Sequence, residues 1–406
     1  MKFKYFLIFI LFPLSVSADT VEIDGIWYNL IAKAQSAEVV ANPNRYYVES
    51  VKIPEEVEYN GNKYIVNTIG TYAFDWSRVK EVTIPSSIKS MKYGAFYKCN
   101  DLTKVYISDL EAWLKIEFED ATSNPMYYGY AQLFLNGEEL NKLVIPNNIE
   151  TIGDNSFIGC SSLTSVIIPN TVKSIGENAF LDCKNLSYIE IPNSVTYMGK
   201  GCFFSCENIT DIVIPNSVIE IGDYVFSGCT KLSSLKLSTG LTFIPAGAFE
   251  HCKSLLSVEI PDNIQSFYTY IDRGAFSDCS NLKKLTLGGG VSYIERKTFS
   301  ECKQLEEVIC LSVTPPKADI DVFYDSMIDY TTLYVPDGSV ESYKVEVPWK
   351  NFKEILPLSS SGIKTIMVGD EIKDIYAPDG SRRSEITKGI NIVRTKNGNT
   401  KKVLIK

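Results

Sequence analysis

A chain of 406 residues with a formal net charge of −9 lacks the basic surface that a nucleic-acid-binding protein needs. Its hydrophobic residues make up 45% of the sequence, enough to bury a large core. A single histidine excludes metal sites built from several histidines and argues against a serine or cysteine catalytic triad.

The first 18 residues have the pattern of a secretory signal peptide. Lys2 and Lys4 form a charged start, Tyr5–Leu14 is apolar, and Val16–Ala18 supplies small residues for cleavage. The apolar run is too short to span a bilayer, and no later segment is long and apolar enough to do so. We therefore expect a signal peptide at 1–18, a secreted or cell-surface protein and no transmembrane segment.

Residues 19–50 precede the repeating part of the chain and differ from it. The stretches Ile23–Leu30 and Ala37–Val40 read as strands. A coil at the end of a repeat stack exposes its core face unless another segment covers it. We therefore expect residues 19–50 to form an N-terminal β cap.

A phenylalanine followed three residues later by a cysteine recurs along the chain. From Phe157 to Phe249 every step is 23 residues, the step to Phe276 is 27, and the step to Phe299 is 23 again. A period in this range marks a leucine-rich-repeat solenoid, in which each unit contacts only its neighbours. The recurring pairs are Phe96/Cys99, Phe157/Cys160, Phe180/Cys183, Phe203/Cys206, Phe226/Cys229, Phe249/Cys252, Phe276/Cys279 and Phe299/Cys302.

Each repeat unit begins with a short strand and then turns. In the unit that starts at Leu163, Val166 and Ile168 should point inward and Ile167 outward, because side chains alternate along a strand. A proline then ends the strand, and Gly176 is expected to make a bend with a positive φ. We predict an α/β, β-rich leucine-rich-repeat solenoid over residues 51–310, with about ten parallel-stranded repeats of about 23 residues.

The phenylalanines and cysteines of these pairs should form two buried columns that support the stack. Neighbouring coils lie about 4.8 Å apart, which suits the Cα separation of a disulfide, but parallel Cβ atoms do not converge as a disulfide requires. We expect free thiols that act as small hydrophobic residues. A bridge between Cys202 and Cys206 is the alternative.

Residues 108–140 form an insertion that lengthens one repeat. Leu110–Ile116 has helical spacing, and Phe134–Leu140 has the pattern of a hairpin. One interpretation is a packed excursion that fills one missing coil. The other is an exposed loop that contacts a ligand through Tyr127 and Tyr128.

Two further segments follow the last regular repeat. Residues 311–358 should form a final repeat and a C-terminal cap, in which Thr332–Pro336 is a strand. Residues 359–406 should form a linker and a small β tail with a hairpin turn at Asn397-Gly398.

The outward strand positions are the best candidates for a binding site. In a parallel stack they form rows, and the main row is expected to run as far as Thr286 and Ile309. Exposed apolar patches often mark interaction surfaces, but the same residue types also favour strands without any further role. The candidate binding residues on this surface are Tyr106, Val144, Ile167, Tyr188 and Val213.

The sequence shows no pattern for catalysis, a metal or a cofactor. His251 precedes Cys252 at a corner where other units carry Gly or Asp, so we expect a surface residue rather than a general base. The aspartates within 319–329 could offer oxygen ligands to Ca²⁺, but they lack the spacing of a ligand loop. We therefore expect no catalytic residue, no metal site and no cofactor.

The repeat pattern Ile-Pro-x-x-Val-x-x-Ile-Gly-x-x-Ala-Phe-x-x-Cys-x-x-Leu spans roughly residues 50–345 and resembles that of the BspA-like leucine-rich-repeat surface proteins. The insertion, from Ser108–Trp113 to Leu135–Glu139, is also similar to one found in that family. The resemblance implies a bacterial surface or secreted protein without catalytic residues. Some members of the family bind extracellular-matrix proteins of a host or other bacteria.

The tail resembles the C-terminal sorting domains of the type IX secretion route. The resemblance rests on Ile375–Arg383, Lys388–Val393 and Lys401–Val403. Many such tails begin with Tyr-Asp/Asn-Leu-x-Gly-Arg, whereas this chain has Ala377-Pro378 after the tyrosine. The resemblance implies export by that route, and a simple appended β module is the alternative.

Three functions are consistent with these observations. We expect a non-catalytic adhesin whose partner is a host or microbial protein, with a glycan as a further ligand class. The second hypothesis is a structural surface component without a specific ligand. The third is an enzyme that acts on glycans, because the scattered Asp and Glu residues permit a carboxylate pair.

Overall fold

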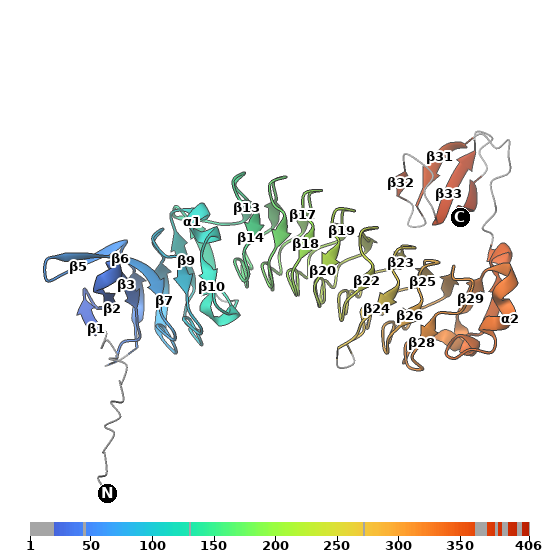
Figure 1. Ribbon diagram of the computed structural model, residues 1–406, viewed down its shortest axis with the longest axis horizontal. Coiled ribbons are helices and arrows are strands. Elements are labelled where there is room, and N and C mark those ends of the chain that lie inside the picture. The colour runs from blue at the N-terminus through green and yellow to red at the C-terminus, as the bar shows by residue number, and fades with distance from the viewer. Residues whose placement is uncertain are drawn as a thin grey trace, which may run out of the picture.

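The computed structural model describes residues 20–43, 46–129, 131–270, 273–361, 372–377, 381–383, 389–395 and 400–405. The expected signal peptide at 1–18 lies outside this part of the chain. The chain forms an elongated stack of coils that ends near α2 (Val340–Tyr343), and a small β module lies above the last coils (Figure 1). The β-rich leucine-rich-repeat solenoid predicted from the 23-residue period is confirmed.

Each regular coil contributes one strand to a long parallel face. Lys142 lies opposite Ser165, and Ser165 lies opposite Tyr188, because residues one repeat apart take the same place in successive coils. We call the outer surface of these strands the sheet face. Its strands are β4 (Val48–Lys52), β7 (Arg78–Thr83), β9 (Lys104–Ile107), β11 (Gln132–Leu135), β13 (Lys142–Val144), β15 (Ser165–Ile167), β17 (Tyr188–Glu190), β19 (Asp211–Val213), β21 (Ser234–Lys236), β23 (Ser257–Ile260), β25 (Lys284–Leu287), β27 (Glu307–Cys310), β29 (Thr332–Val335) and β30 (Glu354–Pro357).

A second series of short strands runs along another side of the coils. Each of these strands follows the sheet-face strand of its coil, as β16 at Ser174–Ile175 follows β15, and they also pair in parallel with their neighbours. The stack has about 12 turns in all, since the insertion and the C-terminal segment add strands to the regular repeats. The second series consists of β8 (Ser90–Met91), β10 (Glu117–Phe118), β14 (Thr151–Ile152), β16 (Ser174–Ile175), β18 (Tyr197–Met198), β20 (Glu220–Ile221), β22 (Phe243–Ile244), β24 (Ser266–Phe267), β26 (Tyr293–Ile294) and β28 (Lys317–Ala318).

The corner around each phenylalanine needs left-handed backbone at two positions. In the coil of Phe180, Asn178 has φ 52° and Asp182 has φ 58°, two residues before and two residues after the ring. The positive φ expected at Gly176 is therefore wrong. Gly176 is needed for space instead, because a Cβ there would lie 2.6 Å from the backbone nitrogen of Asp154 in the preceding coil.

The phenylalanines of the repeat form a buried column. From Phe157 to Phe299, the ring centroids of successive coils lie 5.1 to 5.8 Å apart, and the ring planes are nearly parallel. Phe96 stacks in the same way on Phe74, whose ring centroid lies 4.8 Å away. These rings fill the centre of each coil and join it to the next.

The cysteines form a second buried column, and all ten are free thiols. Most of the thiols in the repeat donate a hydrogen bond to the carbonyl of the phenylalanine one coil earlier, as from Cys183 Sγ to Phe157 O at 3.2 Å. Ser326 occupies the same place in the coil of Phe323, and its hydroxyl donates to Phe299 O at 2.7 Å. The thiol is therefore a buried hydrogen-bond donor as well as a small apolar group.

We expect native protein to resist alkylation at these cysteines and denatured, unreduced protein to react at nearly all of them. Burial shields the sulfurs and raises the pKa of the Cys160 and Cys302 thiols to about 12, so little reactive thiolate forms at neutral pH. Mass spectrometry after alkylation measures both states. Recovery of most of these cysteines as disulfides from unreduced, denatured protein would contradict the thiol column.

The N-terminal segment covers the first coil with an antiparallel hairpin. β1 (Thr20–Ile23) pairs with β2 (Ile26–Ile31), and η1 (Ala32–Ala34) leads to β3 (Ser36–Val39). β3 then joins the stack in parallel through β6 (Asn62–Ile69), which also forms a hairpin with β5 (Glu56–Tyr59).

The insertion forms a coil of its own. α1 (Leu110–Leu114) leads to β10, which pairs in parallel with β8, and the chain then passes through η2 (Ala121–Ser123) to β11. β11 pairs in parallel with β9, and β12 (Glu138–Glu139) turns back on β11. The packed excursion is thus the interpretation that the backbone pairing supports.

Ser123 takes the place of the phenylalanine in the inserted coil. In a regular coil, the amide of Phe157 donates to the carbonyl of Ala179, which directly precedes Phe180 of the next coil. The amide of Phe96 donates in the same way to the carbonyl of Thr122, which directly precedes Ser123. The column of rings is therefore interrupted here. Trp113 of α1 is buried at this joint and donates from Nε1 to Ser156 O at 3.0 Å.

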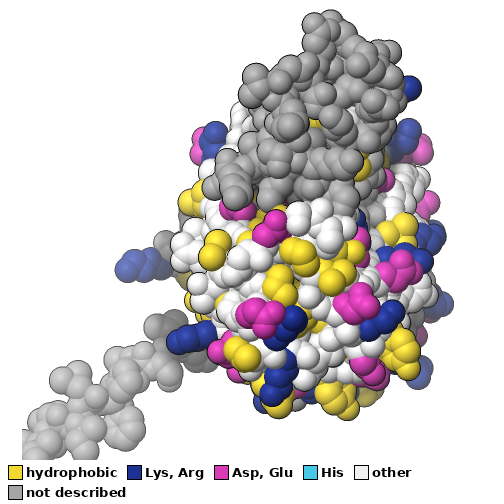
Figure 2. Space-filling model, turned by 90° about the vertical axis from the view of Figure 1, so that its right-hand side faces the viewer, with side chains coloured by type: hydrophobic (Ala, Val, Ile, Leu, Met, Phe, Trp, Pro, Cys, Tyr) yellow, Lys and Arg dark blue, Asp and Glu magenta, His cyan; other side chains and the backbone are white. Residues whose placement is uncertain are grey.

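The C-terminal cap closes the stack with aromatic side chains. η3 (Ile328–Tyr330), η4 (Asp337–Ser339) and η5 (Trp349–Asn351) surround α2 and the last two strands of the sheet face. Tyr343 and Trp349 are buried, with ring centroids 5.7 Å apart. Figure 2 looks at this end and shows charged side chains of both signs among hydrophobic ones, as a solvent-facing cap requires.

The β tail follows η6 (Leu358–Ser361) and is antiparallel. β31 (Ile372–Tyr376) lies between β32 (Arg382–Arg383) and β33 (Gly389–Thr395), and β33 pairs with β34 (Thr400–Ile405). The expected turn at Asn397-Gly398 lies outside the described residues.

Candidate functional site

The middle of the sheet face carries four exposed apolar or aromatic side chains, which we call the apolar stripe. Val144, Ile167, Tyr188 and Val213 are 57, 57, 58 and 58% exposed. Their inward neighbours along the strands are buried, so the exposure follows from strand alternation rather than from loose packing. The stripe spans β13, β15, β17 and β19, which come from consecutive coils.

Tyr106, the fifth candidate on this face, is half-buried. Phe134 of the inserted coil lies opposite it across β9 and β11, and the two ring centroids are 5.1 Å apart. Sequence reasoning missed Phe134 as a member of the outward row. Leu133 is buried and Phe134 half-buried, as strand alternation requires, but the inserted coil lies outside the 23-residue period, so the repeat gave no register for Phe134.

The outward row does not stay open as far as Thr286 and Ile309, both of which are buried. The expectation that they face outward to solvent is wrong, because segments beyond the repeats cover this end of the face. Ile309 packs with Leu358 of η6, and Arg383 Nη2 of the tail lies 3.7 Å from Glu259 Oε2 (Figure 1).

Charged residues pair across neighbouring strands at both ends of the sheet face. Lys104 Nζ lies 2.9 Å from Glu81 Oε1, and the hydrogen bond to this carboxylate raises the pKa of the lysine. Lys284 Nζ lies 2.6 Å from Glu307 Oε1 near the other end. The apolar stripe therefore lies between charged regions that already have partners.

The structure places the two tyrosines of the insertion at the corners of the coils, away from the apolar stripe. Tyr127 and Tyr128 are half-buried, and their ring centroids lie 5.0 Å apart. Tyr128 also contacts Tyr97 of the preceding coil, with a centroid separation of 6.4 Å. The candidate residues thus fall into two groups rather than one site.

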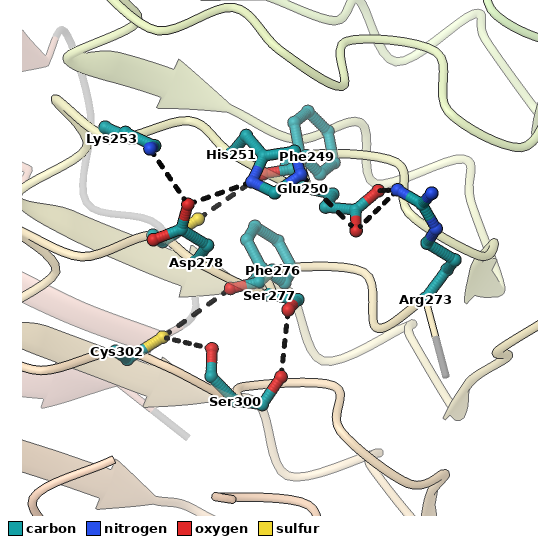
Figure 3. Close-up of polar contacts among 11 residues, drawn as sticks. Phe249, Glu250, His251, Lys253, Arg273, Phe276, Ser277, Asp278, Ser300 and Cys302 are labelled. Atoms are coloured by element: carbon teal, nitrogen blue, oxygen red, sulfur yellow. Dashed lines mark hydrogen bonds and ion pairs between the residues drawn. The ribbon is translucent and has the colours of Figure 1, made fainter. Parts of the chain in front are cut away.

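His251 belongs to an ion-pair cluster on the corner side of the solenoid (Figure 3). Its Nδ1 lies 2.9 Å from Asp278 Oδ2, and Lys253 Nζ lies 3.1 Å from the same oxygen. The neighbouring Glu250 is almost fully buried and receives Arg273 Nη1 at 3.0 Å. Each acidic group here has a basic partner in the same or an adjacent coil, which gives the cluster a structural role in joining coils.

The aspartates after the last regular repeat are engaged in similar pairs. Arg296 Nη2 lies 3.1 Å from Asp321 Oδ2, and Lys303 Nζ lies 3.1 Å from Asp325 Oδ2. Within the described ranges, no group of three or more His, Cys, Asp or Glu side chains could hold a metal ion. None of the helices in that part of the chain is long and apolar enough to cross a membrane.

Parallel strands in register, a buried phenylalanine column and one coil per repeat define a leucine-rich-repeat protein. The family model for the BspA type leucine rich repeat region matches in 6 copies, over residues 44–123, 130–255 and 199–329. The chain therefore belongs to this family. Its members are typically cell-surface or secreted proteins, and leucine-rich-repeat proteins of this kind are typically non-enzymatic binding or scaffold proteins.

Several solved bacterial structures are similar to this chain. A leucine-rich cell surface protein from Faecalibacterium prausnitzii is 21% identical, with a TM-score of 0.41, covering 72% of this chain and 95% of that one. A leucine-rich repeat protein from Bacteroides ovatus is 23% identical, with a TM-score of 0.43 and coverages of 83% and 99%. One from Eubacterium ventriosum is 19% identical, with a TM-score of 0.46 and coverages of 75% and 93%. No curated protein sequence matches the chain.

Proposed function

We propose that this protein is a secreted or cell-surface adhesin that binds a host or microbial protein, without catalysis, through the sheet face. The observation that carries the proposal is the apolar stripe, whose four members are each more than half exposed on consecutive coils. Tyr188 lies in the outward row next to that of the other three, since Ser165 is opposite Tyr188 and Ile167 is opposite Glu190. Exposed apolar side chains gathered on neighbouring strands often mark protein contacts. Solenoids use their long faces as extended binding surfaces.

The composition of the stripe suits a protein partner. Val144, Ile167 and Val213 offer aliphatic surface, and Tyr188 adds a large ring that loses little conformational entropy on binding. The charge pairs on either side, such as Lys104 with Glu81, provide a polar rim.

The tail resembles a sorting domain, and we propose that it directs export by the type IX route.

We expect the double change Ile167→Ser with Tyr188→Ala to weaken binding by about 2 kcal/mol or more, because buried interface anchors carry most of the binding energy. Both side chains point outward, so folding should be nearly unaffected. Biolayer interferometry against a panel of purified extracellular-matrix proteins and bacterial surface proteins would identify a ligand and measure the loss.

A matched control is the change Ser234→Ala with Lys236→Ser on β21, which alters the same two outward positions on a polar strand. This control should bind as the unchanged protein does. Equal affinity for the stripe variant would argue against the stripe as the site. The absence of any ligand in the panel would favour a structural surface component.

A further inference from the structure

We propose that the N-terminal coils carry a second binding site, separate from the sheet face, for a neutral polysaccharide. The site is a cluster of aromatic side chains at the corners of three successive coils, and we call it the aromatic corner. Its residues are Tyr72, Trp76, Tyr93, Tyr97, Lys98, Tyr127 and Tyr128.

The tyrosines of the aromatic corner form a continuous chain of edge-to-face contacts, and Trp76 is linked to them through Lys98, which lies over both its ring and that of Tyr97. Tyr72 lies 5.6 Å from Tyr93 and 6.3 Å from Tyr97, measured between ring centroids. Tyr97 in turn lies 6.4 Å from Tyr128, which contacts Tyr127. Because the contacts run from coil to coil, the cluster extends along the solenoid rather than around one corner.

The outer members of the cluster are open to solvent. Tyr72, Trp76 and Tyr93 are 40, 51 and 50% exposed. Tyr97, Tyr127 and Tyr128 are half-buried, and Tyr97 contacts the exposed Tyr72. Rings held on their neighbours in this way present flat surfaces to a ligand at low entropic cost.

Two of these aromatic residues adopt a backbone conformation that bulky side chains normally avoid. Tyr72 has φ 55° and Trp76 has φ 54°, at the two left-handed corner positions of their coil. At the same positions most other coils use Asn, Gly or Asp, as with Asn155 and Gly159, and a few use other residues such as Ser205 and Glu301. Asparagine, aspartate and glycine tolerate this region well, whereas an aromatic residue there is strained. Tyr224 shows that one aromatic residue is accepted at such a position, where Gly228 takes the other position of its coil. Among the described coils, that of Phe74 alone carries Tyr or Trp at both positions, and keeping both despite better alternatives points to a function other than folding.

Gly94 provides the space in which Tyr72 rests. A Cβ on Gly94 would lie 2.5 Å from Cε1 and 2.7 Å from Cδ1 of that ring. The ring therefore packs directly on the glycine backbone of the next coil. This contact fixes the orientation of an exposed tyrosine, as a preformed binding surface requires.

The charges around the rings favour a neutral ligand. Lys98 Nζ lies 4.3 Å from the centroid of the Trp76 ring and 5.2 Å from that of Tyr97, so the cluster's own lysine already occupies the place of a bound cation. Glu119 and Asp120 lie alongside and accept hydrogen bonds from the amides of Tyr93 and Gly94, so a polyanion would meet repulsion. A neutral sugar chain meets neither obstacle.

The chemistry of the cluster also separates it from the apolar stripe. Its exposed members are rings with polar edges, whereas the stripe is mainly aliphatic. Sugar rings present apolar C–H faces that pack on aromatic rings, and their hydroxyls can bond to phenol and carboxylate oxygens. A row of rings that advances by one coil at a time suits an extended chain of sugar units better than a compact ligand.

The test uses the double change Tyr72→Asn with Trp76→Asn, which installs the residue type that other coils carry at left-handed positions. Affinity electrophoresis in gels containing mannan, mixed-linkage β-glucan or soluble starch, with heparin as an anionic comparison, measures binding. We expect retardation by at least one neutral polysaccharide and a loss of affinity of at least tenfold in the variant. Thermal melting should be unchanged or higher, since the backbone strain is relieved.

Tyr224→Asn is the matched control, because Tyr224 has φ 58° and its ring lies on Gly247 as that of Tyr72 lies on Gly94, but on a distant coil. It should bind the polysaccharide as the unchanged protein does. Retardation by heparin alone, no retardation by any neutral polysaccharide, or equal retardation of the double variant would overturn the proposal. The proposal would also be overturned if the Tyr72→Asn, Trp76→Asn variant lost binding to a protein ligand and kept its binding to the polysaccharide.

Discussion

Replacing Phe203 with alanine is expected to lower the free energy of unfolding by about 3–5 kcal/mol. The side chain is fully buried, and its ring lies 5.4 Å from that of Phe180 and 5.3 Å from that of Phe226. The cavity would be shared by two neighbouring coils, whose rings cannot close it without moving the backbone. Urea denaturation followed by far-UV circular dichroism measures the change.

Tyr188→Ala serves as the control for this change, because it removes another aromatic side chain from the same region at a position that is mostly exposed. Its effect on the free energy of unfolding should stay within about 0.5 kcal/mol. An unchanged denaturation midpoint for Phe203→Ala would mean that the register of the phenylalanine column is wrong.

The regular coils could be predicted from the sequence because one residue pattern recurs at a fixed interval. Given a parallel stack, the 23-residue step places Val166 beside Ile189 and Phe180 beside Phe203 without any knowledge of long-range contacts. The position of left-handed residues is harder to predict. Asn178 and Asp182 are of residue types that tolerate the left-handed conformation, but a glycine such as Gly176 tolerates it as well. Gly176 does not adopt that conformation, because it is needed for the close approach of the preceding coil.

The covered end of the sheet face could not be predicted from the repeat. Thr286 and Ile309 keep the alternation of outward residues, and their burial depends on η6 and the tail, which are not part of the period. The same limit applies to Phe134, because the inserted coil has its own spacing. Contacts between elements that share no repeat leave no regular signal in one sequence.

The aromatic corner lay within reach of sequence reasoning, although only Tyr127 and Tyr128 were identified as candidates. Asn, Gly and Asp are the most frequent residues two positions before and after the phenylalanine. Tyr72 and Trp76 depart from them at both positions of one coil, whereas Tyr224 and His251 each have a glycine at the other position. In a repeat protein, such departures at positions with a strong backbone preference are informative. The contacts of Tyr97 with Tyr72 and with Tyr128 of the insertion arise only when the coils stack, so the sequence alone did not indicate them.

Trp113→Ala is expected to cost about 3–5 kcal/mol and to divide the unfolding transition into two steps. The side chain is buried where the inserted coil meets the coil of Phe157, and its Nε1 donates to Ser156 O. Asn124 Nδ2 supports the same joint by donating to Asn155 O at 2.8 Å. In a solenoid the stability of each interface decides whether neighbouring coils unfold together.

The interruption of the phenylalanine column makes the joint between the inserted coil and the coil of Phe157 depend strongly on the Trp113 side chain. Ser123 stands where a phenylalanine stacks in other coils, so Phe96 and Phe157 are not connected by a ring between them. Loss of Trp113 would remove apolar contact and leave the carbonyl of Ser156 with only a longer bond from Asn124 at 3.4 Å. The coils before and after the joint would then melt at different temperatures, which differential scanning calorimetry resolves.

Trp113→Phe separates the two contributions, because phenylalanine keeps most of the volume and removes the donor. We expect it to cost about 1–3 kcal/mol, the usual penalty for an unsatisfied buried polar group, and to keep a single transition. A single, unshifted transition for Trp113→Ala would show that the two parts of the solenoid are held together by the paired backbone of other segments. An equal loss for both variants would assign the strength of the joint to the hydrogen bond rather than to packing.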